Sequence, residues 1–454
     1  MASDRFFIKT LTLENFRCFE KAELGPFDPH FNLLVGTNGA GKSSVLLALA
    51  NLFRQEANSP AGIARGPLVG DLDVRMNVQD IANRLERKAT PSRGEISSSF
   101  EWGARSFVYS EPFGDERGLV KPELLKPSLE QTSGEPVGLS WPDTERAYPL
   151  IVRFTTDRRF RRWTRIDGNA PEPRPESRWD AFRDWTNAGA DCDALRKWMR
   201  SQTLIALQDQ VLDHNLILDG SGGILYPGGR PAPHLQIVQS AVQRAVEGAR
   251  SIEYVERRKD IIVAFEDGRA VDFSNMSDGQ RALAGMVAEI ARRACLLNSA
   301  YLGELALTET PGLVLIDELD LHLHPRWQRR VIGDLKRIFP NIQFFATTHS
   351  PQVIGEARPE EIVLLTPTGE QKRPLQSYGM DSNWVLECVM EAEGRDPKVA
   401  KEIVRLYDEI EDGKFEEARA RIAILRKEIG GFGDVEAAES YMWRVEHEGD
   451  EAVE

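Results

Sequence analysis

The sequence predicts an α/β fold in which a largely parallel sheet is flanked by helices. The first observation is a glycine-rich segment at 36–43, Gly-Thr-Asn-Gly-Ala-Gly-Lys-Ser, which follows an apolar run at 31–35. The second is a pair of short apolar runs at 312–316 and 342–346, with a helical segment at 327–338 between them. Strands that alternate with helices favour parallel pairing, because a crossover helix returns the chain to the starting end of the sheet.

The glycine-rich segment matches G-x-x-x-x-G-K-[S/T] and opens an apolar helical stretch at 43–53. Its glycines let successive backbone N–H groups turn toward a phosphate, and the helix N-terminus adds a partial positive charge. Lys42 can then reach the terminal phosphates of a nucleoside triphosphate, and the Ser43 hydroxyl can bind Mg²⁺. A ligand-free glycine turn before a helix is the alternative, which the strand–loop–helix context disfavours. The residues expected to bind the nucleotide here are Gly36, Asn38, Gly39, Ala40, Gly41, Lys42, Ser43 and Ser44.

Composition places the chain among ordinary globular proteins, with 454 residues of which 41% are hydrophobic and 28% charged. This length suits two or three domains, or one large domain with insertions. No apolar run is as long as a membrane span, the N-terminus lacks a signal-peptide pattern, and the four cysteines form no C-x-x-C pair. We therefore expect a cytoplasmic protein with no membrane partner, disulfide framework or structural zinc site. A net charge of −14 argues against non-specific coating of DNA, although it is compatible with a local basic groove.

A second part of the predicted site is the run Val-Leu-Ile-Asp-Glu at 314–318. An apolar strand that ends in two carboxylates places them at the carboxyl edge of a parallel sheet, where ligands bind. Asp317 is expected to hold Mg²⁺, directly or through water, and Glu318 to orient or deprotonate the attacking water. An exposed Asp-Glu pair at the end of a strand is the alternative. The upstream phosphate loop favours the catalytic interpretation.

Two further segments distinguish between classes of phosphate-loop protein. Met-Ser-Asp-Gly-Gln-Arg at 276–281 precedes an amphipathic helix and resembles the signature of ABC ATPases. In that class, residues at the positions of Ser277 and Gly279 contact the γ-phosphate of ATP held by another subunit, as a helix N-terminus can. A plain helix cap formed by Ser277 or Asp278 is the alternative. His349 follows a buried strand and would hydrogen-bond the γ-phosphate, as the switch histidine of that class does.

The phosphate loop, signature, acidic strand and switch histidine occur in the order expected of an ABC-type P-loop ATPase head. The resemblance implies a mixed or parallel sheet with helices, ATP and Mg²⁺ as cofactors, and Lys42, Glu318 and His349 as catalytic residues. It also implies that one chain does not complete the site. Two chains would enclose two ATP molecules head to tail in a homodimer or a higher even oligomer, with Ser277 and Gly279 acting in trans.

The chain lacks the marks of several branches of that class. We find no span or coupling segment of a transporter. The segment between Lys42 and Ser277 has no sustained heptads and contains many Pro and Gly, which disfavours a long coiled-coil arm. The segment after His349 is too short for a Toprim nuclease domain and shows no acidic metal-binding pattern. We therefore expect no nuclease within this chain.

The stretch 316–354, with Ile-Asp-Glu-Leu-Asp-Leu-His-Leu-His-Pro and Thr-Thr-His-Ser-Pro, resembles a RecF-like family of stand-alone bacterial ABC ATPases. That family includes the ATPases of Septu and retron antiphage systems. The resemblance extends to Asn-Phe-Arg-Cys-Phe at 15–19, which implies Arg17 as a nucleotide-binding residue, and to the region after 378, so that about half of the chain is covered.

The same resemblance implies an ATPase that regulates a separately encoded HNH-type nuclease in antiphage defence. In retrons it also implies a reverse transcriptase with its DNA–RNA product, so that nucleic acid would be contacted through the complex. Two alternatives remain: a RecF-like DNA-repair clamp, and a scaffold held together by bound ATP with little turnover.

Four regions are expected: an N-terminal part of the ATPase head at 1–60, an α+β insertion at 61–250, the rest of the head at 251–375 and a C-terminal helical tail at 376–454. Two strands joined by the turn Glu266-Asp267-Gly268 are expected at 251–275. The tail, with two or three helices, is expected to bind a partner or to support assembly.

Two other clusters are ambiguous from the sequence. The arginines within 153–165 could contact nucleic acid, a partner or nucleotide phosphates, or could form a solvated face, and Arg158 is the one favoured near the nucleotide. His322 and His324 resemble a metal pair, but because no third ligand is evident we expect them to pack and hydrogen-bond. The loop that enters the insertion has no clear glutamine of the kind that couples Mg²⁺ to the insertion in ABC ATPases.

Overall fold

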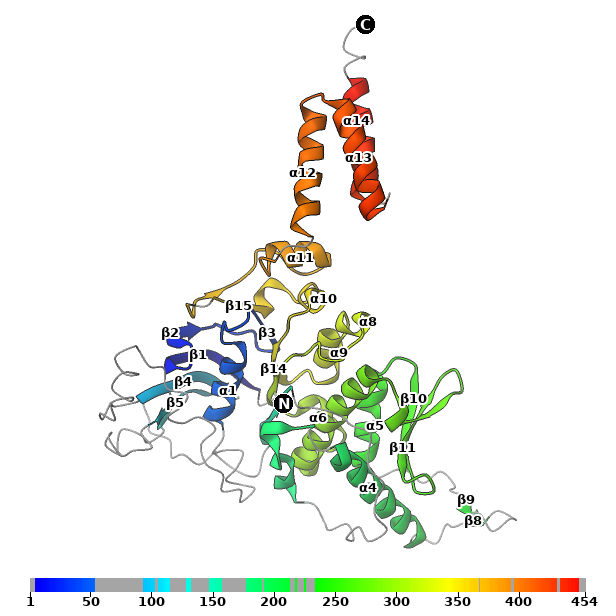
Figure 1. The fold of residues 1–454 in the computed structure, drawn as a ribbon. Coiled ribbons are helices and arrows are strands. Elements are labelled where there is room, and N and C mark those ends of the chain that lie inside the picture. Colours follow the sequence, from blue (N-terminus) through cyan, green and yellow to red (C-terminus); the bar gives the residue numbers. More distant parts are fainter. Residues whose placement is uncertain are drawn as a thin grey trace, which may run out of the picture. The chain divides into compact units, whose positions relative to one another are not determined.

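The computed structural model divides into two compact units, Met1–Asp381 and Ser382–Glu454 (Figure 1). The domain boundaries predicted at 60, 250 and 375 stay predictions. The structure describes residues 5–53, 93–102, 105–114, 128–131, 147–156, 177–189, 192–212, 217–218, 224–225, 233–366, 368–392, 396–430 and 433–448.

In the described part of the larger unit, the central sheet has six strands. Their spatial order is β16 (Gln371–Lys372), β15 (Ile362–Leu365), β3 (Phe31–Val35), β14 (Ile342–Thr347), β13 (Gly312–Ile316) and β7 (Leu150–Phe154). Five of these strands run parallel, and β16 pairs antiparallel at one edge. Strands β3, β13 and β14 are buried along their whole length, as expected of parallel strands covered on both faces. This mixed, mainly parallel sheet confirms the predicted fold class.

The register of the parallel strands brings their carboxyl ends to one edge of the sheet. Ile316 pairs with Phe154 on one side and with Ala346 on the other. Thr347 in turn pairs with Leu34. The segments that follow β3, β7, β13 and β14 therefore leave the sheet together, at the edge where parallel sheets bind ligands.

A second sheet is antiparallel, with the order β2 (Phe19–Leu24), β1 (Phe6–Phe16), β4 (Arg93–Trp102), β5 (Arg105–Gly114) and β6 (Ser128–Gln131). Helix α1 (Lys42–Leu52) contacts strands of both sheets and is buried along nearly its whole length (Figure 1). The helix predicted at 43–53 is thus confirmed to within one residue. The predicted insertion supplies β4–β6 to this sheet and β7 to the central sheet, so both sheets combine strands from within and outside the insertion.

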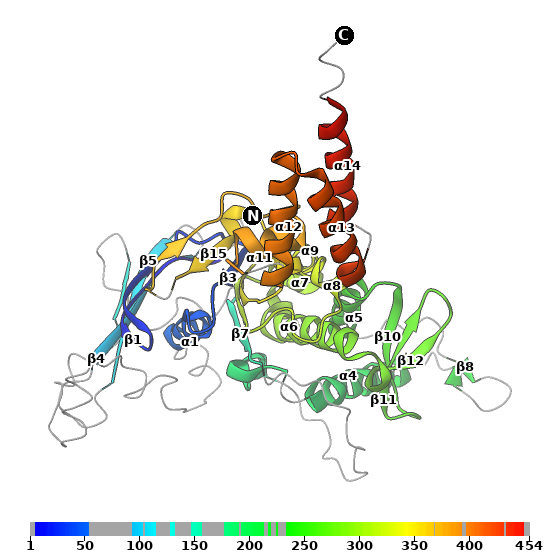
Figure 2. The same cartoon turned by 45° about the horizontal axis from the view of Figure 1, so that its top comes forward.

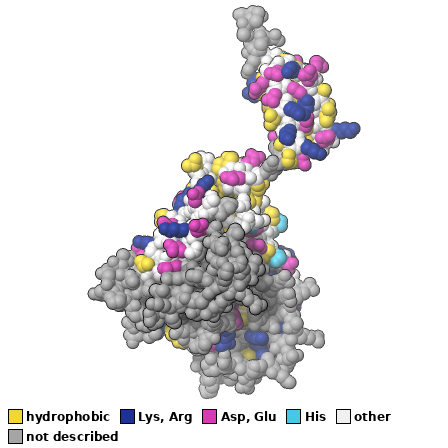
Figure 3. Space-filling model, turned by 60° about the vertical axis from the view of Figure 1, so that its left-hand side comes forward, with side chains coloured by type: hydrophobic (Ala, Val, Ile, Leu, Met, Phe, Trp, Pro, Cys, Tyr) yellow, Lys and Arg dark blue, Asp and Glu magenta, His cyan; other side chains and the backbone are white. Residues whose placement is uncertain are grey.

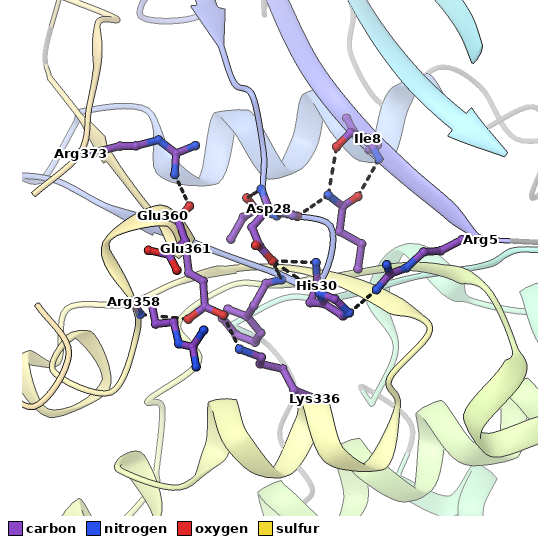
Figure 4. Close-up of polar contacts among 12 residues, drawn as sticks. Arg5, Ile8, Asp28, His30, Lys336, Arg358, Glu360, Glu361 and Arg373 are labelled. Carbon is purple, nitrogen blue, oxygen red and sulfur yellow. Dashed lines mark hydrogen bonds and ion pairs between the residues drawn. The ribbon is translucent and has the colours of Figure 1, made fainter. Parts of the chain in front are cut away.

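Gln343 of β14 joins the two sheets inside the core, where it is fully buried. Its Oε1 accepts the backbone N–H of Ile8 at 2.7 Å, and its Nε2 donates to the Ile8 and Asp28 carbonyls at 3.0 and 2.8 Å. Figure 4 shows these contacts beside an ion pair between Lys336 and Glu361. Together they hold β1 against β14, and the helix that carries Lys336 against the turn before β15.

Helix α6 (Asp278–Leu302) contacts β7 of the central sheet, and α4 (Cys192–Leu212) and α5 (Pro233–Ala245) pack against α6. On α6 the buried carboxylate of Glu289 accepts from Arg292 at 2.8 and 3.0 Å and from Arg293 at 2.7 Å. Burial by itself raises the pKa of Glu289, but the two guanidinium groups outweigh it and lower this pKa to about 2. Arg293 also donates to the carbonyl of Ala181, which fixes the turn η3 (Arg178–Phe182) against α6.

A three-stranded antiparallel sheet packs against α4 and α5 (Figure 2); its strands are β10 (Ala249–Val255), β11 (Asp260–Phe265) and β12 (Ala270–Asp272). The turn predicted at 266–268 joins β11 to β12, but the predicted number of two strands at 251–275 was wrong. The missed turn is the polar segment 256–259, which contains neither Gly nor Pro and in which Lys259 takes the left-handed conformation with φ 52°.

The helix predicted at 327–338 is divided into α8 (Pro325–Gln328) and α9 (Val331–Ile338). The remaining short elements of this unit are β8 (Ile217–Leu218), β9 (Ile224–Leu225), α7 (Ala306–Glu309), α10 (Pro351–Ile354) and the 3-10 turns η4 (Trp185–Asn187), η5 (Phe273–Asn275), η6 (Gly303–Leu305) and η7 (Pro359–Glu361). Within the described ranges, no helix is both long and apolar enough to cross a membrane.

Among the described residues, the smaller unit contains four helices where two or three were expected: α11 (Ser382–Cys388), α12 (Pro397–Glu411), α13 (Phe415–Ile429) and α14 (Asp434–Glu448). Its core is a small apolar cluster formed by Leu406, Ile410, Ala418, Ile422, Leu425, Val435, Ala438 and Met442. Ion pairs join the helices, among them Arg421 with Glu409 and Arg426 with Glu439. Figure 3 shows basic and acidic side chains interspersed on one face of this unit.

Candidate functional site

The glycine-rich loop lies against the turn between β1 and β2. Gly41 has φ 94°, and a Cβ at this position would lie 2.2 Å from the Phe19 ring and 2.8 Å from the Cys18 sulfur. Only glycine therefore fits both the backbone conformation and the space at position 41. Asn38 and Gly39 are exposed on the outer side of the loop, whereas Ala40 and Ser44 are buried.

The side chain of Lys42 folds back over this loop. Its Nζ donates to the carbonyls of Gly36 and Thr37 at 2.8 and 3.0 Å, and the residue is only 8% exposed. Burial lowers the pKa of Lys42, and the carboxylates of Asp317 and Glu318 act in the opposite direction. The ammonium group therefore lies between the phosphate loop and the acidic end of β13.

Ser43 and Thr347 meet at the carboxylate of Asp317. The Ser43 Oγ donates to Asp317 Oδ1 at 3.1 Å, and the Thr347 Oγ1 donates to the same oxygen at 2.7 Å. The Thr347 Oγ1 also accepts the backbone N–H of Glu318 at 2.7 Å. The two segments that the sequence predicts to hold Mg²⁺ are thus in direct contact.

The donor set at this point fits Mg²⁺ bound with a nucleotide. Mg²⁺ prefers oxygen ligands and is commonly held by one carboxylate and a hydroxyl together with phosphate oxygens and water. Ser43 and Asp317 supply such a pair. Across the described residues, no group of three or more His, Cys, Asp or Glu side chains could hold a metal by itself, and this includes His322 and His324.

Glu318 has φ 52°, a left-handed conformation that costs a residue with a side chain about 1 kcal/mol or more. The hydrogen bond from its backbone N–H to Thr347 holds this conformation in place. Strain of this kind gathers at functional sites, where the surrounding structure maintains it. The conformation of Glu318 therefore agrees with a functional role for its carboxylate.

His349 leaves the same edge of the sheet, and its side chain is exposed. Its backbone N–H donates to Asp320 Oδ1 at 3.4 Å, and the hydroxyl of the preceding Thr348 donates to the same carboxylate oxygen. Ser350 caps α10 through its Oγ and donates from it to Gln328 Oε1 at 2.7 Å. These contacts tie the segment around His349 to the segment that follows Glu318.

Ser277 and Gly279 form a separate group. The Ser277 Oγ accepts the backbone N–H of Gln280 at 3.4 Å, so the helix cap given above as the alternative to the signature is present; Ser277 itself is exposed. A Cβ on Gly279 would lie 2.5 Å from the carbonyl of His322 and 3.0 Å from the ring of Trp327. The predicted signature thus packs on the segment after Glu318, whereas Lys42 and Ser43 contact the loop and Asp317.

Arg17 projects from the β1–β2 turn that supports Gly41. It has φ 50°, is exposed, and its guanidinium lies 5.8 Å from the Phe16 ring centre. Arg158 lies outside the described residues, as do its neighbours to 165. Thr347 and Asp320 were not predicted from the sequence, although both are polar residues next to a predicted strand end, a signal that would have found them.

Residues 31–355 match the model of the AAA_21 family, described as an AAA domain, putative AbiEii toxin, Type IV TA system. The chain belongs to this family. The match includes the phosphate loop, the acidic strand and His349. The AAA_21 chain is therefore a nucleotide-binding ATPase.

This AAA_21 chain is similar to several known proteins. It is 25% identical over 442 residues to the retron Ec83 probable ATPase of Escherichia coli, and the alignment covers 86% of this chain and 77% of that protein. It is 34% identical over 141 residues to the Septu protein PtuA of Bacillus thuringiensis, covering 29% of this chain and 34% of that protein. The match to a solved structure of the recombination mediator protein RecF covers 82% of this chain and 99% of the RecF chain, with 12% identity and a TM-score of 0.40. The resemblance to retron and Septu ATPases is confirmed.

Proposed function

We propose that this ATPase pairs head to tail with a second copy when ATP binds. This pairing and the hydrolysis of ATP would regulate a separately encoded effector nuclease in bacterial antiphage defence. The observation that supports it most is the 3.1 Å contact between Ser43 Oγ and Asp317 Oδ1, because it joins the phosphate loop to the acidic strand. The names of two relatives, a retron ATPase and a Septu protein, support the role in defence.

Within one head, the loop N–H groups and Lys42 would bind the phosphates, and Ser43 and Asp317 would hold Mg²⁺. When bound, Mg²⁺ neutralises charge on the β- and γ-phosphates. Glu318 would orient the attacking water and accept its proton. His349, at the same edge of the sheet, would donate to the γ-phosphate. Arg17 would approach the nucleotide from the β1–β2 turn.

The second head would complete the site through Ser277 and Gly279. The exposure of Ser277 at the N-terminus of α6 supports this, since a helix N-terminus attracts an anion. Gly279 is buried against His322 and Trp327 rather than against the phosphate loop of its own chain, so the exposed Ser277 would be the group that reaches the other head's nucleotide. A homodimer, or a higher even oligomer, follows from this arrangement.

Glu318→Gln tests the proposal. We expect hydrolysis to fall by about a hundredfold or more, since a general base contributes on that scale, while ATP binding persists. The variant should then accumulate as an ATP-dependent dimer, measured by light scattering with and without nucleotide. Glu304→Gln, which changes an exposed carboxylate on η6, is the matched control. Hydrolysis at the wild-type rate would exclude Glu318 as the base, and a monomeric Glu318→Gln variant in ATP would exclude ATP-driven pairing.

Two further measurements separate the alternatives. An ATP-bound scaffold releases no phosphate even with DNA, RNA or the nuclease present. A RecF-like clamp binds duplex DNA on its own, in an ATP- and salt-dependent manner. The defence assignment instead requires that an HNH-type nuclease encoded beside this chain, with a reverse transcriptase and its DNA–RNA product in a retron, co-purifies with it and cleaves only in one nucleotide state.

A further inference from the structure

Arg153 lies on the same face of the central sheet as Asp317. The parallel register pairs Arg153 of β7 with Leu315 of β13, and paired residues of neighbouring strands point to the same face. The ladder continues beyond β13, because the Asp317 N–H donates to the Phe154 carbonyl at 2.9 Å. Asp317, two residues after Leu315, therefore returns to the face of Arg153.

This face is the one that carries the phosphate loop. The Ser43 hydroxyl reaches Asp317 on it, and so does the hydroxyl of Thr347. Arg153 stands one strand further out, on β7, which is the edge strand on that side among the described residues. Its side chain therefore lies on the face of the sheet that carries the proposed Mg²⁺ and phosphate site.

The surroundings of the Arg153 side chain favour an anionic partner. Its Nε is buried and makes no hydrogen bond within the described part of the chain. Burial lowers the pKa of Arg153. The Asp317 carboxylate opposes this effect and the Arg17 guanidinium adds to it, so Arg153 lies within electrostatic range of both residues. A buried donor left without an acceptor costs free energy, and a bound phosphate oxygen would satisfy it.

We propose that Arg153 binds the terminal phosphate of the bound nucleoside triphosphate and lets the site distinguish a triphosphate from a diphosphate. This rests on the proposed nucleotide site and adds to it a residue outside the four sequence motifs. The planar guanidinium suits a phosphate better than an ammonium group does, because its N–H groups can engage two oxygens at once. A diphosphate has no oxygen at the position that Arg153 borders.

Arg153→Met keeps the length of the aliphatic stem and removes the charged group. Binding of a non-hydrolysable β,γ-imido analogue of ATP and of ADP, each with Mg²⁺, is measured by calorimetry for the wild type and the variant. We expect the variant to lose about tenfold in affinity for the ATP analogue, equivalent to about 1.4 kcal/mol, and less than about threefold for ADP. Arg258→Met, at an exposed residue that pairs with Asp272 in the β10–β12 sheet, should change neither affinity.

An equal loss for both nucleotides, or no loss for either, overturns the assignment of Arg153. If Arg153→Met does not fold, Arg153→Lys keeps the charge without the fork and must show the same selective loss; failure to do so also overturns it. Lys42→Ala distinguishes this from failure of the nucleotide site itself. If Lys42→Ala binds neither nucleotide and Arg153→Met binds both with wild-type affinity, the nucleotide site stands and the role of Arg153 is rejected. If the wild type binds neither nucleotide, both proposals are rejected.

Discussion

The hydroxyl of Thr347 donates to Asp317 Oδ1 at 2.7 Å and accepts the backbone N–H of Glu318 at the same distance. One side chain thus orients the predicted Mg²⁺ ligand and holds the backbone of the predicted base. It comes from β14, whereas both carboxylates follow β13. The catalytic geometry therefore depends on the register between these two strands.

Thr347→Val keeps the shape of the side chain and removes both hydrogen bonds. We expect the rate of ATP hydrolysis to fall by about tenfold or more, and the free energy of unfolding to fall by about 1 kcal/mol because the half-buried Glu318 N–H loses its acceptor. Thr347→Ser keeps the hydroxyl and should retain most of the activity. Steady-state phosphate release and denaturant unfolding measure the two effects. Equal rates in the Val and Ser variants would show that the hydroxyl does not position Asp317.

Gly41→Ala should disrupt the phosphate loop more than Gly39→Ala. Both positions have positive φ, 94° and 84°, so each substitution costs about 1 kcal/mol of backbone strain. Only at Gly41 does the new methyl group overlap Phe19, while nothing lies within 4 Å of a Cβ at Gly39. We expect ATP affinity to fall by about tenfold or more in the first variant and by no more than a few-fold in the second. Equal affinities would mean that the Phe19 contact does not constrain the loop.

Gly279→Ala should prevent the pairing of two chains without weakening the binding of ATP. Its methyl group would lie 2.5 Å from the His322 carbonyl, which displaces the start of α6 from the segment after Glu318. We expect ATP to bind one head as before, while the ATP-dependent dimer of the Glu318→Gln background is lost. Gly333→Ala, on α9 with open space around the new methyl group, is the control and should stabilise its helix by about 1 kcal/mol. A dimer that survives Gly279→Ala contradicts the role of the signature segment in pairing.

The buried cluster of Glu289, Arg292 and Arg293 makes stability depend on acid pH. The folded pKa of Glu289 is about 2, below the value of about 4.3 for an unfolded glutamate. Its contribution is therefore complete above about pH 4.5 and is lost as the pH falls toward 2. Unfolding midpoints measured from pH 7 to pH 3 should show this decline.

Glu289→Gln removes that dependence and leaves two buried guanidinium groups without their carboxylate. We expect a loss of about 3–5 kcal/mol at neutral pH and a shallower acid decline than in the wild type. Glu304→Gln, at an exposed position, should leave the acid decline as it is. An acid decline of equal steepness in Glu289→Gln would assign the pH dependence to other carboxylates.

The sequence predicted those parts of the site in which a local pattern coincides with the chemistry. The loop at 36–43 and the acidic strand end at 314–318 each combine an apolar strand with polar residues at fixed spacing, and the structure brings them into contact. The start of α6 was also placed correctly, because Ser277 caps it.

The rest depends on pairing between distant segments, which local patterns do not encode. Thr347 looks like an ordinary β-branched strand residue until its neighbour in the sheet is known. The pairing of β7 with β13 joins residues from an irregular stretch to the acidic strand, and it places Arg153 opposite Leu315, two residues before Asp317. The turn at 256–259 and the break between α8 and α9 were missed because neither contains proline or glycine.

The position of β7 also limits how this ATPase can be shortened. Leu150–Phe154 pairs residue by residue with Gly312–Ile316 and separates the strand before Asp317 from the edge of the sheet. A minimal head could be made by excising the stretch between the phosphate loop and the signature. This deletion would expose the buried apolar strand β13 along its whole length, which favours aggregation. The smallest workable head must therefore retain β7, and engineering of the insertion should be confined to segments outside that strand.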